Sequence, residues 1–221
     1  MNIKEEILNL IFPPVCSFCG KIDRNCLCED CKIKLKKLDH FNIDRYNKKD
    51  IYFNEHIYLF QYENFIREQI INYKFNNKPY YYMTFEKIFI NNQKICDNLK
   101  SYDIIVSVPM HNKKKRERGY NQTEIIAKQL SKDVEKQGTN LKYVNSLNKT
   151  KNNTAQSLLN KKQRIENAKN AYSINETEII KNKRILIFDD IFTTGSTANE
   201  CAKILKKYTN KKIGVLTIAK D

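Results

Sequence analysis

The sequence predicts an α/β protein in which helices cover both faces of a parallel sheet, with a small head at the N-terminus. The stretches 184–191 and 212–219 each contain an apolar run, ILIF at 185–188 and IGVLTIA at 213–219, and a strand without polar alternation is buried on both faces. The helical pattern between them predicts the crossover that joins parallel strands. A dense group of cysteines within residues 16–31 predicts the head. We therefore expect two units, residues 1–45 for the cysteine knuckle and residues 46–221 for the sheet.

The other elements are predicted from the spacing of apolar residues. Aromatic and β-branched residues predict strands over residues 50–62, 102–110 and 141–147. Apolar residues on one side predict helices over residues 3–11, 63–75, 80–92 and 120–133. A last helix, between the two apolar strands, is expected to bury Ala198, Cys201, Ala202, Leu205 and Tyr208. The polar segment 148–164 is predicted to be a mobile loop.

Charge and composition narrow the classes of partner. The chain has 40 Lys and Arg against 25 Asp and Glu, a formal net charge of +15. This balance favours polyanionic partners such as nucleic acid or phosphorylated small molecules. The alternative is a general compositional habit, because the chain is also crowded with asparagine, isoleucine and tyrosine. No apolar run approaches the roughly 18 residues of a spanning helix and no secretory signal is recognisable, so we expect a cytoplasmic protein without membrane insertion.

The stretch RILIFDDIFTTGSTANECAKILKK, residues 184–207, indicates a ligand site. Asp189 and Asp190 stand at the expected end of a buried strand, where open parallel sheets bind their ligands. Two carboxylates suit the two hydroxyl donors of a ribose. The next loop offers hydroxyls and backbone N–H groups to a phosphate at the start of a helix, and it comprises Thr193, Thr194, Gly195, Ser196 and Thr197. A solvated strand end and an ordinary helix cap would explain each part singly, but not their succession.

This stretch resembles the phosphoribosyl-pyrophosphate (PRPP) motif of the type I phosphoribosyltransferases. The resemblance implies a parallel sheet flanked by helices, with a hood above the site, and PRPP bound together with Mg²⁺. A basic loop over residues 113–118 follows the strand that ends at Pro109 and should lie at the same edge of the sheet. Because guanidinium groups bind a diphosphate with paired donors, we expect Lys113, Arg116 and Arg118 to contact PRPP. A solvated basic turn is the alternative.

The segment around this loop resembles the ComF family, which is known from bacterial competence for DNA uptake. The family signature VPLH…RERGFNQ is matched by Pro109, His111, Arg116, Arg118, Gly119, Tyr120, Asn121 and Gln122. Further along, the family's basic and aromatic stretch, a flexible loop that closes over PRPP in related transferases, is matched by Gln156, Arg164, Asn167 and Tyr172. Lys149, Lys151 and Asn153 depart from this stretch, because the family usually has arginine, arginine or lysine, and threonine there.

Two CxxC pairs form the cysteine knuckle, and they consist of Cys16, Cys19, Cys28 and Cys31. Four thiolates at this spacing can close a tetrahedral site around zinc that leaves no position for water, so a zinc ion is expected to be structural. Cysteines in a reducing compartment favour metal binding or packing over disulfides. Cys26 competes with Cys28 for the third position, and the CxxC spacing favours Cys28. Cys96 and Cys201 are expected in the core. ComF-like proteins carry a similar N-terminal cysteine cluster.

Other groups give weaker indications. His111 is expected to have a structural role. The interleaved lysines and aromatic residues of segment 73–83 offer stacking surfaces for single-stranded DNA, although packing in the core is the preferred interpretation.

The resemblance implies a protein of DNA uptake and natural transformation that binds a PRPP-type sugar phosphate with Mg²⁺, and single-stranded DNA. The alternative is an active phosphoribosyltransferase that transfers ribose 5-phosphate to an unidentified nucleobase or amine. In that enzyme Asp189 and Asp190 would be the catalytic pair that holds the ribose. A third possibility is a structural zinc module that docks a competence helicase. Because no base-specific acceptor pocket is recognisable, DNA uptake ranks first.

Overall fold

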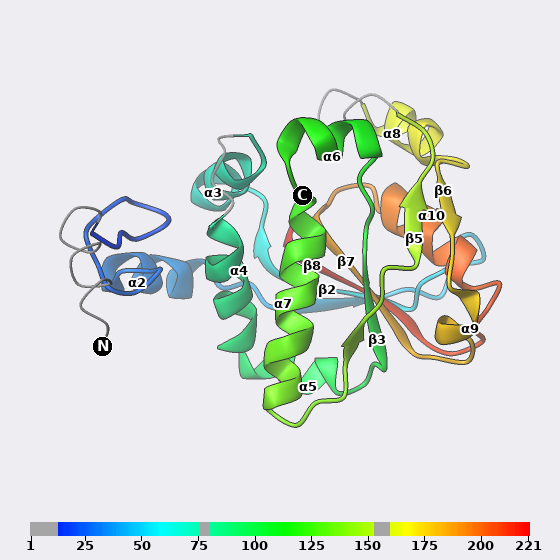
Figure 1. Cartoon of the computed structure of the whole chain (residues 1–221), viewed down its shortest axis with the longest axis horizontal. Helices are drawn as coiled ribbons and strands as arrows, with labels where there is room; N and C mark the ends of the chain where they lie inside the picture. Colours follow the sequence, from blue (N-terminus) through cyan, green and yellow to red (C-terminus); the bar gives the residue numbers. More distant parts are fainter. Residues whose placement is uncertain (1–12, 76–79, 153–159) are drawn as a thin grey trace.

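A six-stranded sheet forms the centre of the molecule (Figure 1). The computed structural model describes residues 13–75, 80–152 and 160–221, so the helix expected over residues 3–11 lies outside the described residues, as does Gln156. The strand order is β1-β2-β8-β7-β3-β4, and every neighbouring pair is parallel except β1 with β2. The strands are β1 (Asn42–Arg45), β2 (Glu55–Gln61), β3 (Ile104–Ser107), β4 (Lys142–Tyr143), β7 (Ile185–Phe192) and β8 (Ile213–Lys220). The predicted α/β architecture with a largely parallel sheet is thereby confirmed.

The two faces of the sheet belong to two separate apolar cores. Along β7, Leu186 and Phe188 point into one core, whereas Ile185 and Ile187 point into the other. All four side chains are fully buried. Burial on both faces explains why this strand, and β8 beside it, have apolar sequences without polar alternation.

Helices cover the first face, and two helices with a small hairpin cover the second (Figure 1). On the first face lie α2 (Glu29–Leu38), α3 (Asn64–Phe75), α4 (Tyr81–Ile90), α5 (Gln93–Leu99) and α7 (Gln122–Lys136). On the second face lie α10 (Ser196–Leu205), α9 (Thr177–Ile180) and the antiparallel hairpin of β5 (Leu147–Lys149) and β6 (Tyr172–Ile174). Two further helices, α6 (Asn112–Arg118) and α8 (Lys161–Ala168), project beyond the sheet.

Three predicted elements differ from the structure. The strand expected over residues 50–62 begins only at Glu55, and a separate edge strand, β1, precedes it. The strand expected over residues 141–147 divides into β4 and β5, which belong to different sheets. The segment 148–164 is not one loop, because Lys149 ends β5 and α8 begins at Lys161. In each case tertiary pairing, rather than local propensity, decides where the strand begins or ends.

The packing predictions for cysteine were right, and one for tyrosine was wrong. Cys96 and Cys201 are buried, as expected. Tyr208 was expected on the buried side of α10, but its exposed fraction is 38%. The helix ends at Leu205, so Tyr208 lies beyond the last turn and no longer follows the helical spacing. Among the described residues, no helix combines the length and the apolar character that crossing a bilayer requires.

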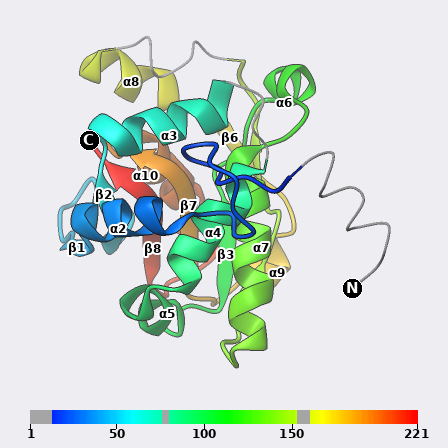
Figure 2. The same ribbon diagram turned by 90° about the vertical axis from the view of Figure 1, so that its left-hand side faces the viewer.

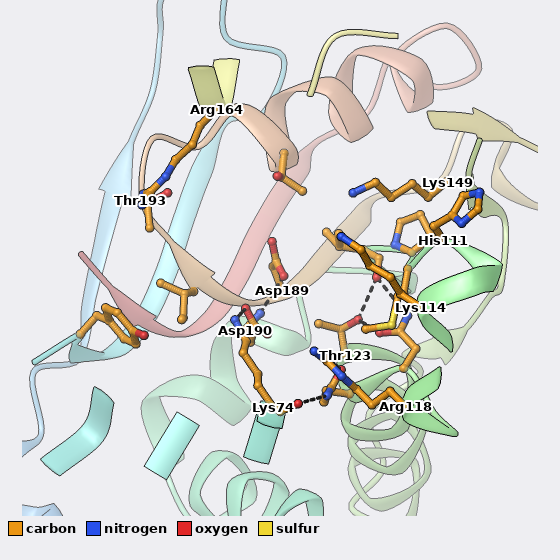
Figure 3. A pocket seen from close by; sticks show the side chains of 18 of the residues that line it. Lys74, His111, Lys114, Arg118, Thr123, Lys149, Arg164, Asp189, Asp190 and Thr193 are labelled. Atoms are coloured by element: carbon orange, nitrogen blue, oxygen red, sulfur yellow. Dashed lines mark hydrogen bonds and ion pairs between the residues drawn. The ribbon is translucent and has the colours of Figure 1, made fainter. Parts of the chain in front are cut away.

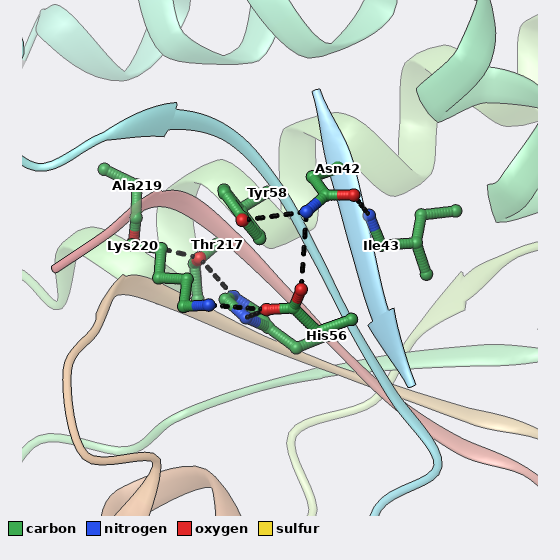
Figure 4. A network of polar contacts seen from close by, with 8 residues as sticks. Asn42, Ile43, His56, Tyr58, Thr217, Ala219 and Lys220 are labelled. Carbon is green, nitrogen blue, oxygen red and sulfur yellow. Dashed lines mark hydrogen bonds and ion pairs between the residues drawn. The ribbon is translucent and has the colours of Figure 1, made fainter. Parts of the chain in front are cut away.

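A polar network attaches β1 to the sheet (Figure 4). Lys220 Nζ lies 2.7 Å from an Asp44 carboxylate oxygen, and Asn42 donates to the hydroxyl of Tyr58 at 3.1 Å. His56 Nε2 lies 2.8 Å from Thr217 Oγ1, and that hydroxyl donates its one hydrogen to the carbonyl of Ala219. Burial, followed by the charge of Lys220, lowers the pKa of His56 to about 3, so the ring is neutral and structural.

The cysteine-rich head packs against α3 and α4 (Figure 2). Phe18 is the main contact, because its ring lies 5.6 to 5.7 Å from the rings of Phe65, Tyr81 and Phe85. A buried hydrogen bond of 2.9 Å from Thr84 to Ser17 accompanies it. The head therefore shares the core of the first sheet face instead of hanging free.

Candidate functional site

A cleft of about 1010 Å³ opens at the carboxyl edge of the sheet. Its floor consists of residues in or directly after the last residues of four parallel strands, namely Tyr62 after β2, Val108 after β3, Asp189 and Asp190 within the last four residues of β7, and Asp221 after β8. Helices α3, α6, α7 and α8 and the hairpin strands complete the walls. The position agrees with the general rule that open parallel sheets bind ligands beyond the carboxyl ends of their strands.

The acid pair lies in the middle of the cleft (Figure 3). The sequence predicted that the strand ends at these aspartates, but β7 continues to Phe192. The ladder with β3 stops at the pair Ser107–Phe188, and the cleft opens beside the next two residues. The backbone N–H of Asp190 donates to Asp189 Oδ1 at 2.9 Å. Burial, followed by the negative charge of Asp190, raises the pKa of Asp189 to about 7.

A lysine from α3 contacts the acid pair. Lys74 Nζ lies 2.8 Å from Asp190 Oδ1, and both side chains are largely buried. The last turn of α3 is attached to the start of α7, because the Tyr73 hydroxyl donates to the carbonyl of Gln122 at 3.1 Å and the Tyr120 hydroxyl donates to the carbonyl of Tyr73 at 3.3 Å. Tyr120 and Gln122 of the RERGYNQ stretch thus fix the helix that carries Lys74.

Further cations surround the acids. Lys114 and Arg118 come from α6, Lys149 from β5 and Arg164 from α8 (Figure 3). Burial, followed by the positive charge of Lys114, lowers the pKa of Lys149. Burial also lowers the pKa of Arg118, which donates to Gln122 Oε1 at 2.7 Å. Clustered cations with restricted hydration make this part of the cleft attractive to a phosphate or diphosphate.

The hydroxyl-rich loop folds into the start of α10. Gly195 is the N-cap residue and has a φ of 71°, a conformation that favours glycine. A Cβ atom at this position would lie 2.5 Å from Cζ of Phe192. The Phe192 ring in turn stacks on His56 with a centroid distance of 3.9 Å. Gly195 is therefore required both by the turn and by the aromatic packing beneath it.

The cleft brings together only part of the predicted site. Asp189, Asp190, Thr193, Thr197 and Arg118 line it. The other predicted contacts do not line it, and they are Lys113, Arg116, Thr194, Gly195 and Ser196. Within the loop, Thr194 Oγ1 accepts from the backbone N–H of Ser196 at 3.3 Å, so this hydroxyl caps the turn.

The basic segment was expected to be a loop, and that prediction was wrong. It forms α6, whose first turn is capped by His111 Nδ1 accepting from the backbone N–H of Lys113 at 3.2 Å. Gly119, with a φ of 84°, ends the helix. Lys114 and Arg118 are four residues apart, so both face the cleft, while Lys113 and Arg116 face solvent. A run of charges without apolar spacing gave no signal for this helix.

Sequence reasoning missed Lys74 and Arg67, both of which line the cleft from α3. Neither residue belongs to a recognisable motif. Their place in the site depends on how α3 crosses the strand ends, which is a property of the tertiary fold. The only indication in the sequence was the density of lysine and aromatic residues in segment 73–83, which was assigned to the core. Tyr73 and Tyr81 are indeed fully buried.

The four cysteines of the CxxC pairs come together in the head. The sulfurs of Cys16, Cys19, Cys28 and Cys31 all lie within 4.8 Å of one another. Cys19 and Cys28 sulfurs are 3.6 Å apart, close to the edge of about 3.8 Å that a tetrahedron with metal–sulfur bonds of about 2.3 Å requires. Cys26 is not one of the four. The donor set and its geometry therefore fit a metal such as zinc.

Backbone N–H groups point at these sulfurs. Burial opposes ionisation of Cys16, but hydrogen bonds from the backbone of Cys28, Cys19 and Phe18 lower its pKa to about 7. By contrast, burial and then the sulfur of Cys19 raise the pKa of Cys31. Four crowded sulfurs cannot all ionise without a cation between them, whereas a bound dication would stabilise four thiolates.

Comparison with known proteins identifies a domain family and several relatives. The phosphoribosyl transferase domain family matches residues 117–221, which include α7, β7 and α10. "Competence protein F" of Haemophilus influenzae is 31% identical over 158 residues, which cover 68% of this chain and 66% of that protein. "DNA utilization protein YhgH" of Escherichia coli K12 is 31% identical over 103 residues, which cover 47% of this chain and 43% of that protein. The chain thus spans less than two thirds of these relatives.

Among solved structures, phosphoribosylpyrophosphate synthetase from Mycobacterium smegmatis is partly similar. The TM-score is 0.34 at 12% identity, over 60% of this chain and 33% of that chain. A similarity this low carries no information about ligand or mechanism.

Proposed function

The chain is a ComF-like protein with a phosphoribosyltransferase-type domain, and we propose that it acts in DNA uptake during natural transformation by binding a PRPP-type sugar phosphate in the cleft. The relatives named for competence and DNA utilization support the cellular role. The main support for a sugar phosphate as the ligand is the position of the acid pair. It lies at the sheet edge between the α10 loop and the cations of α6, β5 and α8.

Each wall of the cleft suits one part of such a ligand. Asp189 and Asp190 accept hydrogen bonds from the ribose hydroxyls. Thr193 and Thr197 contact the 5-phosphate at the start of α10. Lys114, Lys149 and Arg164 neutralise the diphosphate. When bound with the sugar phosphate, Mg²⁺ would add positive charge that helps to neutralise the diphosphate.

In the head, the proposed ion is a structural zinc held by Cys16, Cys19, Cys28 and Cys31. Four sulfur ligands leave no open coordination position, so the ion would contribute folding stability and no chemistry. We also propose that the protein works in the cytoplasm, with single-stranded DNA and a competence helicase as partners. The high positive charge of the chain supports the first of these partners.

An active phosphoribosyltransferase is the second candidate. The volume of about 1010 Å³ is at the upper end of the range for small-molecule sites, roughly 300–1,000 Å³, so the cleft has room for an acceptor beside the sugar phosphate. Tyr62 and Ile191 line the side of the cleft near α3 and β8. An acceptor bound there, a nucleobase or an amine, would displace pyrophosphate from the anomeric carbon.

A thermal-shift titration tests the proposed ligand. PRPP with Mg²⁺ at one hundred times its Kd should raise the free energy of unfolding by roughly 2.7 kcal/mol. The variant Asp189→Asn/Asp190→Asn should lose this response. Ribose 5-phosphate and inorganic pyrophosphate serve as separate probes of the two halves of the site. Absence of any shift with PRPP, in a folded protein that retains its metal, would overturn the proposal. Release of pyrophosphate on addition of a base or amine would establish the second candidate.

A further inference from the structure

Two helices at the mouth of the cleft carry cations on more than one side. On α6, Lys114 and Arg118 line the cleft, whereas Lys113 and Arg116 are exposed. On α8, Arg164 lines the cleft and Lys162 is exposed. Figures 1 and 2 both place α6 and α8 at the top of the molecule, and Figure 2 shows them on opposite sides of it. We call Lys113, Arg116 and Lys162 the outer row.

The outer row differs from many other lysines of the surface. Lys21, Lys100, Lys128 and Lys136 each contact a carboxylate at 2.6 to 3.0 Å. No ion pair among the described residues involves a member of the outer row. Two acids lie on the same helices: Glu166 of α8 already pairs with Lys169, and Glu117 of α6 lines the cleft and forms no ion pair with the outer row among the described residues. Three cations against the one carboxylate of Glu117 leave a net positive field beside the cleft mouth.

A single sugar phosphate bound in the cleft would not contact the outer row. The cations that line the cleft already suffice for a phosphate and a diphosphate, and the outer row lies outside the lining. A longer polyanion can use both sets, because its successive phosphates would follow the rim. The cleft itself is too small for a duplex but has room for one or two nucleotides of a single strand.

A strand end also fits the interior of the cleft. The 5′-phosphate of a terminal nucleotide presents the same group, a sugar 5-phosphate, that the α10 loop would take from PRPP. The acid pair does not repel the 5′-phosphate with two full negative charges, because Lys74 neutralises the charge of Asp190. Tyr62, half-buried on the α3 side of the cleft, offers a ring against which a base can stack.

We propose that the outer row binds the backbone of single-stranded DNA whose 5′-phosphorylated end enters the cleft, so that DNA and the sugar phosphate compete for one site. This inference rests on the proposed function for the identity of the sugar-phosphate site. It adds that the two partners exclude each other, and it names the surface that holds the strand.

Fluorescence anisotropy with 20-nucleotide single strands tests the inference. A 5′-phosphorylated strand should bind at least fivefold more tightly than the same strand with a 5′-hydroxyl, and PRPP with Mg²⁺ should displace it. The variant Lys113→Glu/Arg116→Glu/Lys162→Glu should weaken DNA binding at least tenfold. Its slope of log affinity against log salt should become shallower by about one for each phosphate that the variant no longer neutralises. Its thermal stabilisation by PRPP should stay close to that of the unmodified protein.

A matched charge reversal provides the control. Lys203→Glu/Lys207→Glu/Lys211→Glu changes the net charge equally but lies at the far end of α10 and beyond it, where all three residues are exposed. This variant should bind DNA nearly as well as the unmodified protein. An equal weakening of DNA binding in both triple variants would overturn the inference, because net charge alone would then explain DNA binding.

The inference and the proposed function can fail separately. DNA binding that PRPP does not displace, together with a normal thermal shift by PRPP, would overturn the shared site and leave the proposed function standing. Absence of the PRPP shift would overturn the proposed function, and the shared site with it. Both triple variants should keep the melting temperature of the unliganded protein, which excludes misfolding as the cause of weaker binding.

Discussion

The cysteine head and the cleft are the two chemically specialised regions of this molecule, and they are built in opposite ways. The head collects its four sulfurs from residues 16–31, a single short segment. The cleft collects its lining from Tyr62 to Asp221, and from every parallel strand end between β2 and β3. A local segment can specify a metal site by spacing alone, because two tight turns bring the ligands together. A cleft of this kind requires the whole sheet to form first.

The two regions also differ in what they contribute, because the head supports the stability of the fold and the cleft is suited to ligand binding. In the head, Cys16 and Cys28 belong to the apolar core that continues into α3 and α4, so a metal there would support the fold. In the cleft, the raised pKa of Asp189 shows that ionisation of this buried carboxyl is unfavourable, a cost that a bound ligand would justify. The two regions meet at α3, which contacts Phe18 of the head and carries Lys74 into the cleft.

The largest expected effect comes from the head. Cys16→Ser/Cys19→Ser removes half of the sulfur ligands, and we expect loss of bound zinc and a decrease of about 3 kcal/mol or more in the free energy of unfolding. Elemental analysis and thermal denaturation measure the two quantities. Cys26→Ser is the matched control, because Cys26 is outside the four-sulfur group and should leave the metal in place.

The same double variant also tests whether the head and the cleft act independently. If the head acts only on stability, the double variant should still bind PRPP at temperatures where it is folded. Loss of PRPP binding in a folded variant would show that the head controls the cleft, with α3 as the connection.

An intermediate effect is expected at the loop before α10. Gly195→Ala places a Cβ against the Phe192 ring at a φ of 71°, so it should cost about 1–3 kcal/mol of stability and weaken PRPP binding. Gly138→Ala is the control, because its φ of 83° imposes a similar backbone strain while its surroundings are open. Denaturant unfolding of both variants separates the cost of the strained backbone from the cost of the steric clash with the Phe192 ring. An equal destabilisation of the two variants would contradict a role for the Phe192 ring.

A pH dependence is expected from the electrostatics of the cleft. The pKa of Asp189 is about 7, above its ordinary value, so the folded protein retains a proton that the unfolded chain has released. Stability should therefore fall as the pH rises from about 4 to about 7, while binding by the carboxylate form should strengthen as the pH rises through 7. Asp189→Asn should remove the first dependence, which denaturant unfolding at several pH values measures.

Lys74 opposes the rise in the pKa of Asp189. Lys74→Met should therefore raise that pKa further and move the onset of PRPP binding to higher pH, with an affinity loss of up to about tenfold at pH 7. The pH profile of Kd measures the shift, and Lys74→Arg should restore it. An unchanged profile in Lys74→Met would mean that the ion pair does not influence the acid pair.

Sequence patterns predicted those parts of the head and of the cleft that are formed by residues close together in the chain. Two-sided burial leaves a visible apolar run, so β7 and β8 were recognisable. The CxxC spacing indicated four of the seven cysteines, and these four lie together. Helix α6 and the division between β4 and β5 were not predicted, because one has no apolar face and the other depends on which sheet each segment joins.

The sequence by itself determined the buried strands β7 and β8, the cysteine knuckle and the acid pair beside a hydroxyl loop, because each is encoded within one contiguous segment. Only the tertiary structure decided which cations meet that pair. Lys74 reaches Asp190 because α3 crosses the strand ends, and Lys114 faces inward while Lys113 faces outward because α6 is a helix. Contacts between segments distant in the chain depend on how helices and strands pack, and no local pattern records that packing.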